Sequence, residues 1–213
     1  MKKIRTVIIL ALVFSFVFAF GGCSVKEEEP TNIFERVIKI EEGIFSPQKV
    51  EFLASPEEVL EANKDNEVSE KQNPDGYAFN GKAIEGISDD VVIAYNFEDD
   101  MLTTVNYIVR LDETMDKAGY EEVCNTLYNM ALEYMPMTST TLVLDGDKLK
   151  PKPEFDAATE FEPIKEGNGL SWQDEEGNAV RLLFFTRDKY QTSYGFNLSV
   201  HVSRDTMYEA VYG

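Results

Sequence analysis

The residues that carry most enzyme and metal chemistry are scarce in this sequence. Its 213 residues include one histidine and two cysteines. A transition-metal site takes about four His or Cys ligands, so we expect no metal and no cofactor. The sequence also has no Gly-x-Ser-x-Gly turn for a nucleophilic serine and no glycine-rich phosphate loop. These absences exclude the common hydrolase and nucleotide-binding patterns, and we predict no catalytic activity.

Long hydrophobic runs are also lacking, except at the N-terminus. Three basic residues within the first five positions precede the 14-residue apolar run 7–20, which leads into Gly21-Gly22-Cys23. A membrane-spanning helix needs about 20 apolar residues, whereas a shorter run with a charged start is typical of a secretion signal. The segment resembles a bacterial lipoprotein signal peptide, with Phe20 at the position where leucine is usual.

This resemblance implies that the thiol of Cys23 receives a diacylglyceryl group and that cleavage before Cys23 removes residues 1–22. Two acyl chains anchor a protein stably, so we expect the protein at the extracytoplasmic face of the cell membrane, held by the lipid on Cys23. Residues 23–32 are polar and charged, and we expect an acidic tether there. Two alternatives stay open: an ordinary cleaved signal followed by an incidental cysteine, or an uncleaved anchor.

Basic residues are few beside acidic ones. Residues 1–22 hold three of the 20 basic residues and none of the 39 acidic ones, so the rest of the chain has a formal charge of −22. Such a surface repels nucleic acid, and we expect no nucleic-acid partner. If Cys23 is lipidated, Cys124 is the only thiol left and no internal disulfide can form. The apolar neighbours of Cys124 in a helical pattern indicate a buried side chain.

The first part of the folded region is predicted as a helix followed by three strands. Ser55-Pro56-Glu57-Glu58 is a helix start, with a serine cap, a proline in the first turn and a capping-box glutamate. Apolar alternation separated by polar turns then predicts strands at 77–83, 91–97 and 101–110. Before this series, residues 33–40 are expected to form either a strand or a short helix.

The second part repeats this order. Apolar residues recur every three or four positions within 112–135, which predicts an amphipathic helix. Apolar alternation then predicts three further strands, at 169–173, 180–185 and 194–203. We expect the tail from residue 204 to form a frayed turn of helix.

The order of elements predicts an α+β fold: an antiparallel sheet with helices packed on one face, in two similar α-β-β-β halves. We place the halves at 33–112 and 113–213, either as two units or as one continuous domain. With the capped helix 55–59 and the later strands, this order resembles the helix-plus-sheet modules of the β-lactamase inhibitory protein type, and the module of the small lipoprotein in the outer-membrane barrel assembly machine. Those relatives bind other proteins with an exposed sheet face and loops, but a fold alone transfers no function.

Aromatic residues near strand ends and turns are the candidate binding residues. We single out Trp172, Tyr190 and Tyr194, for which packing in the core is the competing role.

The lone histidine is a weak candidate for catalysis. Strand alternation places His201 on a polar face with Ser199 and Ser203, where a surface histidine is the commoner interpretation. The acidic turns at 99–100, 145–147 and 174–178 do not match the twelve-residue calcium loop.

These observations predict a lipid-anchored binding or scaffold lipoprotein of the cell envelope that recognises another protein. The alternative is an accessory lipoprotein that binds a small ligand or a carbohydrate. A carboxylate-dependent hydrolase is the least favoured reading.

Overall fold

The computed structural model describes residues 30–69, 76–136, 140–145, 148–151, 169–185 and 193–212. The helices are α2 (Ile33–Val37), α3 (Pro56–Ala62), α4 (Lys117–Tyr134) and α5 (Arg204–Tyr212). The strands are β1 (Ile38–Glu41), β2 (Ile44–Pro47), β3 (Gly76–Asn80), β4 (Asp90–Glu98), β5 (Met101–Arg110), β6 (Thr140–Asp145), β7 (Lys148–Pro151), β8 (Gly169–Gln173), β9 (Ala179–Phe185) and β10 (Gly195–His201). The predicted signal peptide, Cys23 and Tyr190 lie outside the described residues.

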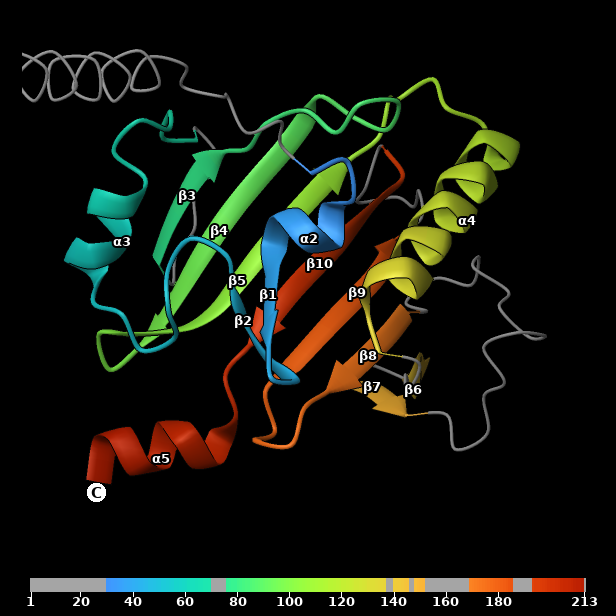
Figure 1. Ribbon diagram of the computed structural model, residues 1–213. Coiled ribbons are helices and arrows are strands. Elements are labelled where there is room, and N and C mark those ends of the chain that lie inside the picture. The colour runs from blue at the N-terminus through green and yellow to red at the C-terminus, as the bar shows by residue number, and fades with distance from the viewer. Residues whose placement is uncertain are drawn as a thin grey trace, which may run out of the picture.

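Eight of the strands form one antiparallel sheet in the order β3-β4-β5-β10-β9-β8-β6-β7 (Figure 1). The runs β3-β4-β5 and β8-β9-β10 each follow a helix, α3 and α4, and the hairpin β6–β7 lies between α4 and β8 in the chain. The two runs join through β5 and β10, where Val105 is opposite Val200 and Val109 is opposite Phe196. The predicted α+β class is therefore confirmed, whereas the domain boundaries stay a prediction.

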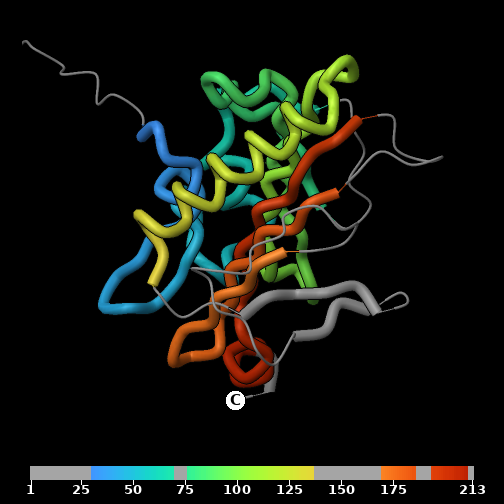
Figure 2. Tube along the Cα trace, turned by 90° about the vertical axis from the view of Figure 1, so that its right-hand side faces the viewer, coloured from blue at the N-terminus to red at the C-terminus, as the bar shows by residue number. Residues whose placement is uncertain are grey.

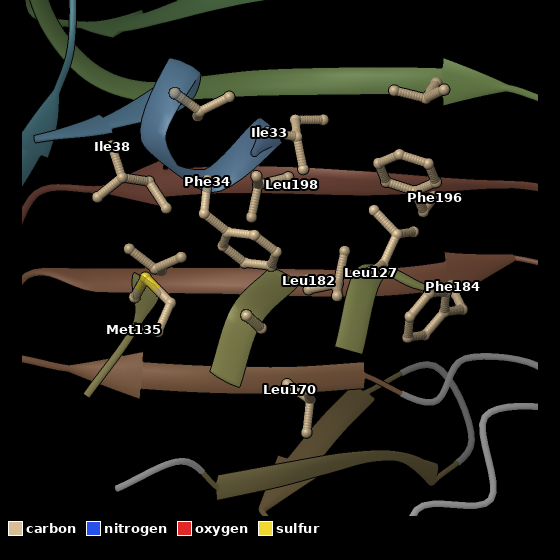
Figure 3. Packing of buried hydrophobic residues seen from close by; sticks show 14 of the residues in the cluster. Ile33, Phe34, Ile38, Leu127, Met135, Leu170, Leu182, Phe184, Phe196 and Leu198 are labelled. Carbon is tan, nitrogen blue, oxygen red and sulfur yellow. The ribbon is translucent and has the colours of Figure 1, made fainter. Parts of the chain in front are cut away.

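One face of this sheet carries the larger hydrophobic core. Because successive strand residues point to opposite faces, the apolar residues at alternate positions of β8, β9 and β10 gather on one side. Figure 2 shows α2, α4 and the hairpin β1–β2 together on that side of the strands. In Figure 3, Phe34 of α2 and Leu127 of α4 lie over Leu182 and Leu198, and all four side chains are buried. Each such burial stabilises the fold by about 1.5–3 kcal/mol.

Helix α4 begins where the spacing of apolar residues changes. In the strands before it they recur every two residues, and in α4 they recur every three or four. The side chain of Asp116 accepts a hydrogen bond from the backbone N–H of Gly119 at 2.9 Å and caps the helix. Its buried residues share one face: Tyr120, Val123, Cys124, Leu127 and Ala131. The predicted burial of Cys124 is thus confirmed, and burial raises the pKa of its thiol to about 12.

A second, smaller cluster lies beneath α3 on the same face of the sheet. Ser55 and Glu58 form the predicted capping box, in which each side chain bonds the backbone N–H of the other residue. Val59 then packs against strand residues of this cluster, among them Phe79, Ile93, Tyr95, Leu102 and Val105. The hydroxyl of Tyr95 donates to Asn63 at 3.2 Å, so these two buried polar groups satisfy each other.

The two ends of the described chain are more regular than predicted. Residues 33–40 contain both expected structures, since α2 passes directly into β1. The tail forms the nine-residue helix α5 rather than a frayed turn. Ser203 stabilises its start, because the Ser203 hydroxyl accepts from the backbone N–H of Thr206 at 3.1 Å.

Candidate binding sites

The sheet face opposite the helices carries a row of polar side chains. We define the polar face by Thr104, Asn106, Arg181, Asn197, Ser199 and His201, which come from the adjacent strands β5, β10 and β9. Helices α2 and α4 lie on the other side of these strands (Figure 2), and Val59 of α3 packs in the cluster on that other side. Strand alternation therefore separates the apolar, helix-covered face from one that is polar on β5, β10 and β9. On the neighbouring strand β4, buried Val92 and Ala94 point to the same side as Asn106.

Hydrogen bonds across the strands fix the side chains of the polar face. His201 lies between two hydroxyls, with Nδ1 at 3.1 Å from Thr104 Oγ1 and Nε2 at 2.8 Å from Ser199 Oγ. Diagonally across β10 and β5, Asn197 Nδ2 donates to Asn106 Oδ1 at 3.1 Å. Burial, and to a smaller extent the positive charge of Arg181, lower the pKa of His201 from its ordinary value of 6.5 to about 4. The imidazole is therefore neutral at pH 7, with one ring nitrogen donating and the other accepting.

The contact between Ser199 and His201 has the distance of a nucleophile and its base, but its surroundings do not suit hydrolysis. Ser199 is only 1% exposed. The other ring nitrogen of His201 faces the hydroxyl of Thr104, where a catalytic triad places a carboxylate. A histidine with a pKa of about 4 is also a weak base at neutral pH. Ser203, which also shares this face in the prediction, caps α5 instead.

The aromatic residues predicted for binding lie in different surroundings. Trp172 is 4% exposed and packs edge-to-face against Phe34 of α2, with ring centroids 5.8 Å apart. Tyr194 is half-buried, and its ring stacks on Tyr120 of α4 at 4.4 Å. Trp172 thus offers almost no surface to a partner, whereas an edge of Tyr194 stays accessible. Tyr190 falls outside the described residues, and its binding role stays a prediction.

The described acidic residues of the predicted turns support the fold, either by accepting backbone hydrogen bonds or by forming a tight turn. Asp174 accepts hydrogen bonds from the backbone N–H groups of Phe45, Glu176 and Asn178, at 2.8–3.0 Å. Asp99 and Asp100 both adopt positive φ in the tight turn between β4 and β5, a conformation that aspartate tolerates. Across the described ranges, no three His, Cys, Asp or Glu side chains come close enough together to hold a metal ion.

A cavity of about 320 Å³, which we call the α2 pocket, is lined by residues of α2 and of the sheet strands β4 and β5. Buried or half-buried residues form its floor: Ile33, Ile84, Val91, Ile93 and Tyr107. Val91 belongs to the larger core and Ile93 to the smaller cluster, and Tyr107 packs against both. The pocket thus opens where the two clusters meet. Its volume is at the lower end of the range for small-molecule sites, about 300–1,000 Å³.

The rim of the α2 pocket is basic in an otherwise acidic chain. Three of its eleven lining residues are basic and only Glu35 is acidic, whereas the chain beyond residue 22 has 17 basic and 39 acidic residues. The basic residues are Arg36, Lys49 and Lys82, which come from three separate segments. Sequence analysis missed this site because residues so far apart in the chain form no motif.

Comparison with protein-family models, with curated proteins and with solved structures finds no significant match for this chain. The resemblance to lipoprotein signal peptides and to the helix-plus-sheet modules therefore stays a prediction. None of the described helices combines the length and the hydrophobicity that a bilayer crossing requires.

Proposed function

We propose that the protein is a lipid-anchored binding lipoprotein of the cell envelope, without catalytic activity, which recognises another protein through its polar face. The lipid on Cys23 holds it at the extracytoplasmic side of the membrane, and the predicted tether 23–32 separates the folded part from the lipid headgroups. The end of this tether already contacts the folded part, because Asn32 caps α2 and the carbonyl of Pro30 accepts a hydrogen bond from Arg36. The N-terminal pattern of charge, apolar run and Gly21-Gly22-Cys23 supports the anchor.

The side of the sheet that faces away from α2, α3 and α4 is the observation that carries the binding role. Arg181 is exposed and the side chains of Thr104, Asn106, Asn197 and His201 are half-buried, so these five are accessible to a partner. Buried Ser199 contributes only by holding His201 in place. Cross-strand hydrogen bonds order this row. Side chains that are ordered before binding lose less entropy on association. Beside them, half-buried Ile108, Leu183 and Phe185 point to the same side. Protein interfaces combine apolar contacts with polar ones in this way.

In-cell crosslinking of the full-length lipoprotein tests this proposal. The captured proteins are identified by mass spectrometry, and three variants run beside the native chain. Arg181→Glu reverses an exposed charge on the polar face, and Lys117→Glu makes the same reversal on α4, on the other side of the sheet. Cys23→Ala removes the proposed anchor.

We expect one partner that native protein and Lys117→Glu capture, and that Arg181→Glu and Cys23→Ala lose. A partner captured equally by Arg181→Glu would place the interface elsewhere and refute the role of the polar face. Capture of no protein above background would contradict protein recognition. The small-ligand alternative has its own support in the α2 pocket, whereas no feature of the described residues favours a carboxylate-dependent hydrolase.

A further inference from the structure

We propose that the α2 pocket binds a small anionic amphiphile, with a carboxylate or phosphate head at the basic rim and a short aliphatic chain on the apolar floor. This site is separate from the polar face, because its floor residues point to the helix-covered side of β4 and β5. The proposal therefore stands or fails independently of the protein partner.

The floor of the pocket selects for an apolar group. Ile84, Val91 and Ile93 have hydrocarbon side chains that line the cavity, but each is at most 4% exposed, so half-buried Tyr107 is the more accessible part of the floor. A volume of 320 Å³ corresponds to roughly ten water molecules at ~30 Å³ each. That space suits a ligand of about ten non-hydrogen atoms, the size of an eight-carbon carboxylate.

Arg36 is the best positioned of the basic groups at the rim. Its Nε donates to the carbonyl of Pro30, and its Nη1 donates to the carbonyl of Ala83 at 3.0 Å. These bonds hold the guanidinium between the start of the described chain and the segment after β3. They use two of its five N–H donors, which leaves donors for an anion. A planar guanidinium fits a carboxylate or a phosphate with two parallel hydrogen bonds.

Lys49 adds a second positive charge, and it has no carboxylate partner within the described ranges. Lys39 on the neighbouring strand β1 differs, because its Nζ lies 3.0 Å from Glu41 and 3.6 Å from Glu51. Lys39 does not line the pocket. The two lysines therefore form a matched pair: both lie in the same part of the fold, but only Lys49 lines the cavity and only Lys39 is paired with carboxylates.

Charge complementarity decides the kind of occupant. A neutral ligand gains no charge attraction from the basic rim, and a cation is repelled by it. A purely polar anion gains nothing from the hydrocarbon floor. Only a molecule with both an anionic head and an apolar chain uses the whole pocket.

Isothermal titration of the full-length protein in nanodiscs of zwitterionic lipid tests the proposal, with empty nanodiscs as the blank. The probes are octanoate, hexanoate, octyl phosphate, octylammonium and inorganic phosphate. We expect octanoate or octyl phosphate to bind. The tighter binder of the two shows whether the natural ligand has a carboxylate or a phosphate head. Hexanoate binds about tenfold more weakly than octanoate, because two methylenes fewer are buried. Octylammonium and inorganic phosphate do not bind.

Two lysine variants locate the binding. Lys49→Gln and Lys39→Gln change the net charge equally, but we expect only Lys49→Gln to weaken octanoate binding, by about fivefold. A third variant, Ile84→Phe, fills part of the floor and weakens octanoate more than hexanoate, with its melting temperature measured to exclude misfolding.

Several results would overturn the proposal. Equal binding of octylammonium and octanoate would show that the rim charge is irrelevant. Equal weakening by both lysine variants would point to the overall charge rather than to this site. Binding of none of the probes would mean that the cavity is a packing gap between the two clusters.

Discussion

Acidification between pH 7 and pH 5 should destabilise the fold through His201. The imidazole is half-buried between Thr104 and Ser199 and has a pKa of about 4, compared with an ordinary value of 6.5. The unfolded chain therefore binds a proton near pH 6.5, whereas the folded chain does so only near pH 4. Stability from neutral His201 is fully present above pH 6.5 and is lost as the pH falls from 6.5 to 4.

The size of this effect follows from the two pKa values of His201. Each pH unit between them corresponds to 1.36 kcal/mol, so the whole loss below pH 4 is about 3 kcal/mol. At pH 5 the unfolded histidine is almost fully protonated and the folded one is mostly neutral. The free energy of unfolding should then be about 2 kcal/mol lower than at pH 7 from this residue alone.

Urea denaturation at both pH values measures the change, and His201→Gln is the control. Glutamine keeps a donor and an acceptor but does not titrate, so the variant should lose about 2 kcal/mol less between pH 7 and pH 5. All other titrating groups are common to both proteins. Because the chain has one histidine, its proton NMR signal gives the pKa directly. Equal losses in both proteins, or an NMR midpoint near 6.5, would refute the reasoning.

Three further predictions concern stability and thiol chemistry. Leu182→Ala removes a fully buried side chain of the larger core and should cost about 2–5 kcal/mol in urea denaturation, whereas Leu60→Ala on exposed α3 should cost about 0.5 kcal/mol or less. Ser55→Ala removes the helix cap of α3 and should cost about 1 kcal/mol, and an unchanged stability would contradict the role of the capping box. Cys124, with a pKa near 12, should not react with a thiol reagent at pH 8 until the protein is unfolded. In that assay a fast-reacting thiol in the native protein would be Cys23, and would show that it carries no lipid.

Local signals in the sequence predict much of the fold. The capping box at Ser55, the change of apolar period before α4 and the alternation in β10 each reflect interactions between neighbours in the chain. The turn at 99–100 is likewise marked by its own acidic residues. Such features need no knowledge of the partner element, and their physical causes lie within a few residues.

Local sequence patterns do not show which strands pair with each other when these strands are far apart in the chain. Nothing near Thr104 indicates that it lies beside His201, because the contact depends on the register of β5 against β10. For the same reason, His201 is a half-buried member of a hydrogen-bonded row rather than the solvated histidine that alternation alone suggests. Trp172 lies near a turn in sequence, yet α2 covers it. The rim of the α2 pocket likewise brings Arg36 together with two lysines from other segments.

The pairing of β5 with β10 also bears on how the chain folds during synthesis and export. Val105 meets its partner only when residue 200 has emerged, so the centre of the sheet is the last part to close. Until then β5 has an unpaired edge, and exposed edges promote association between chains. Contacts that join such distant segments also slow folding. We therefore expect a chain that stops before residue 195 to aggregate, even though it contains α3, α4 and seven strands of the sheet.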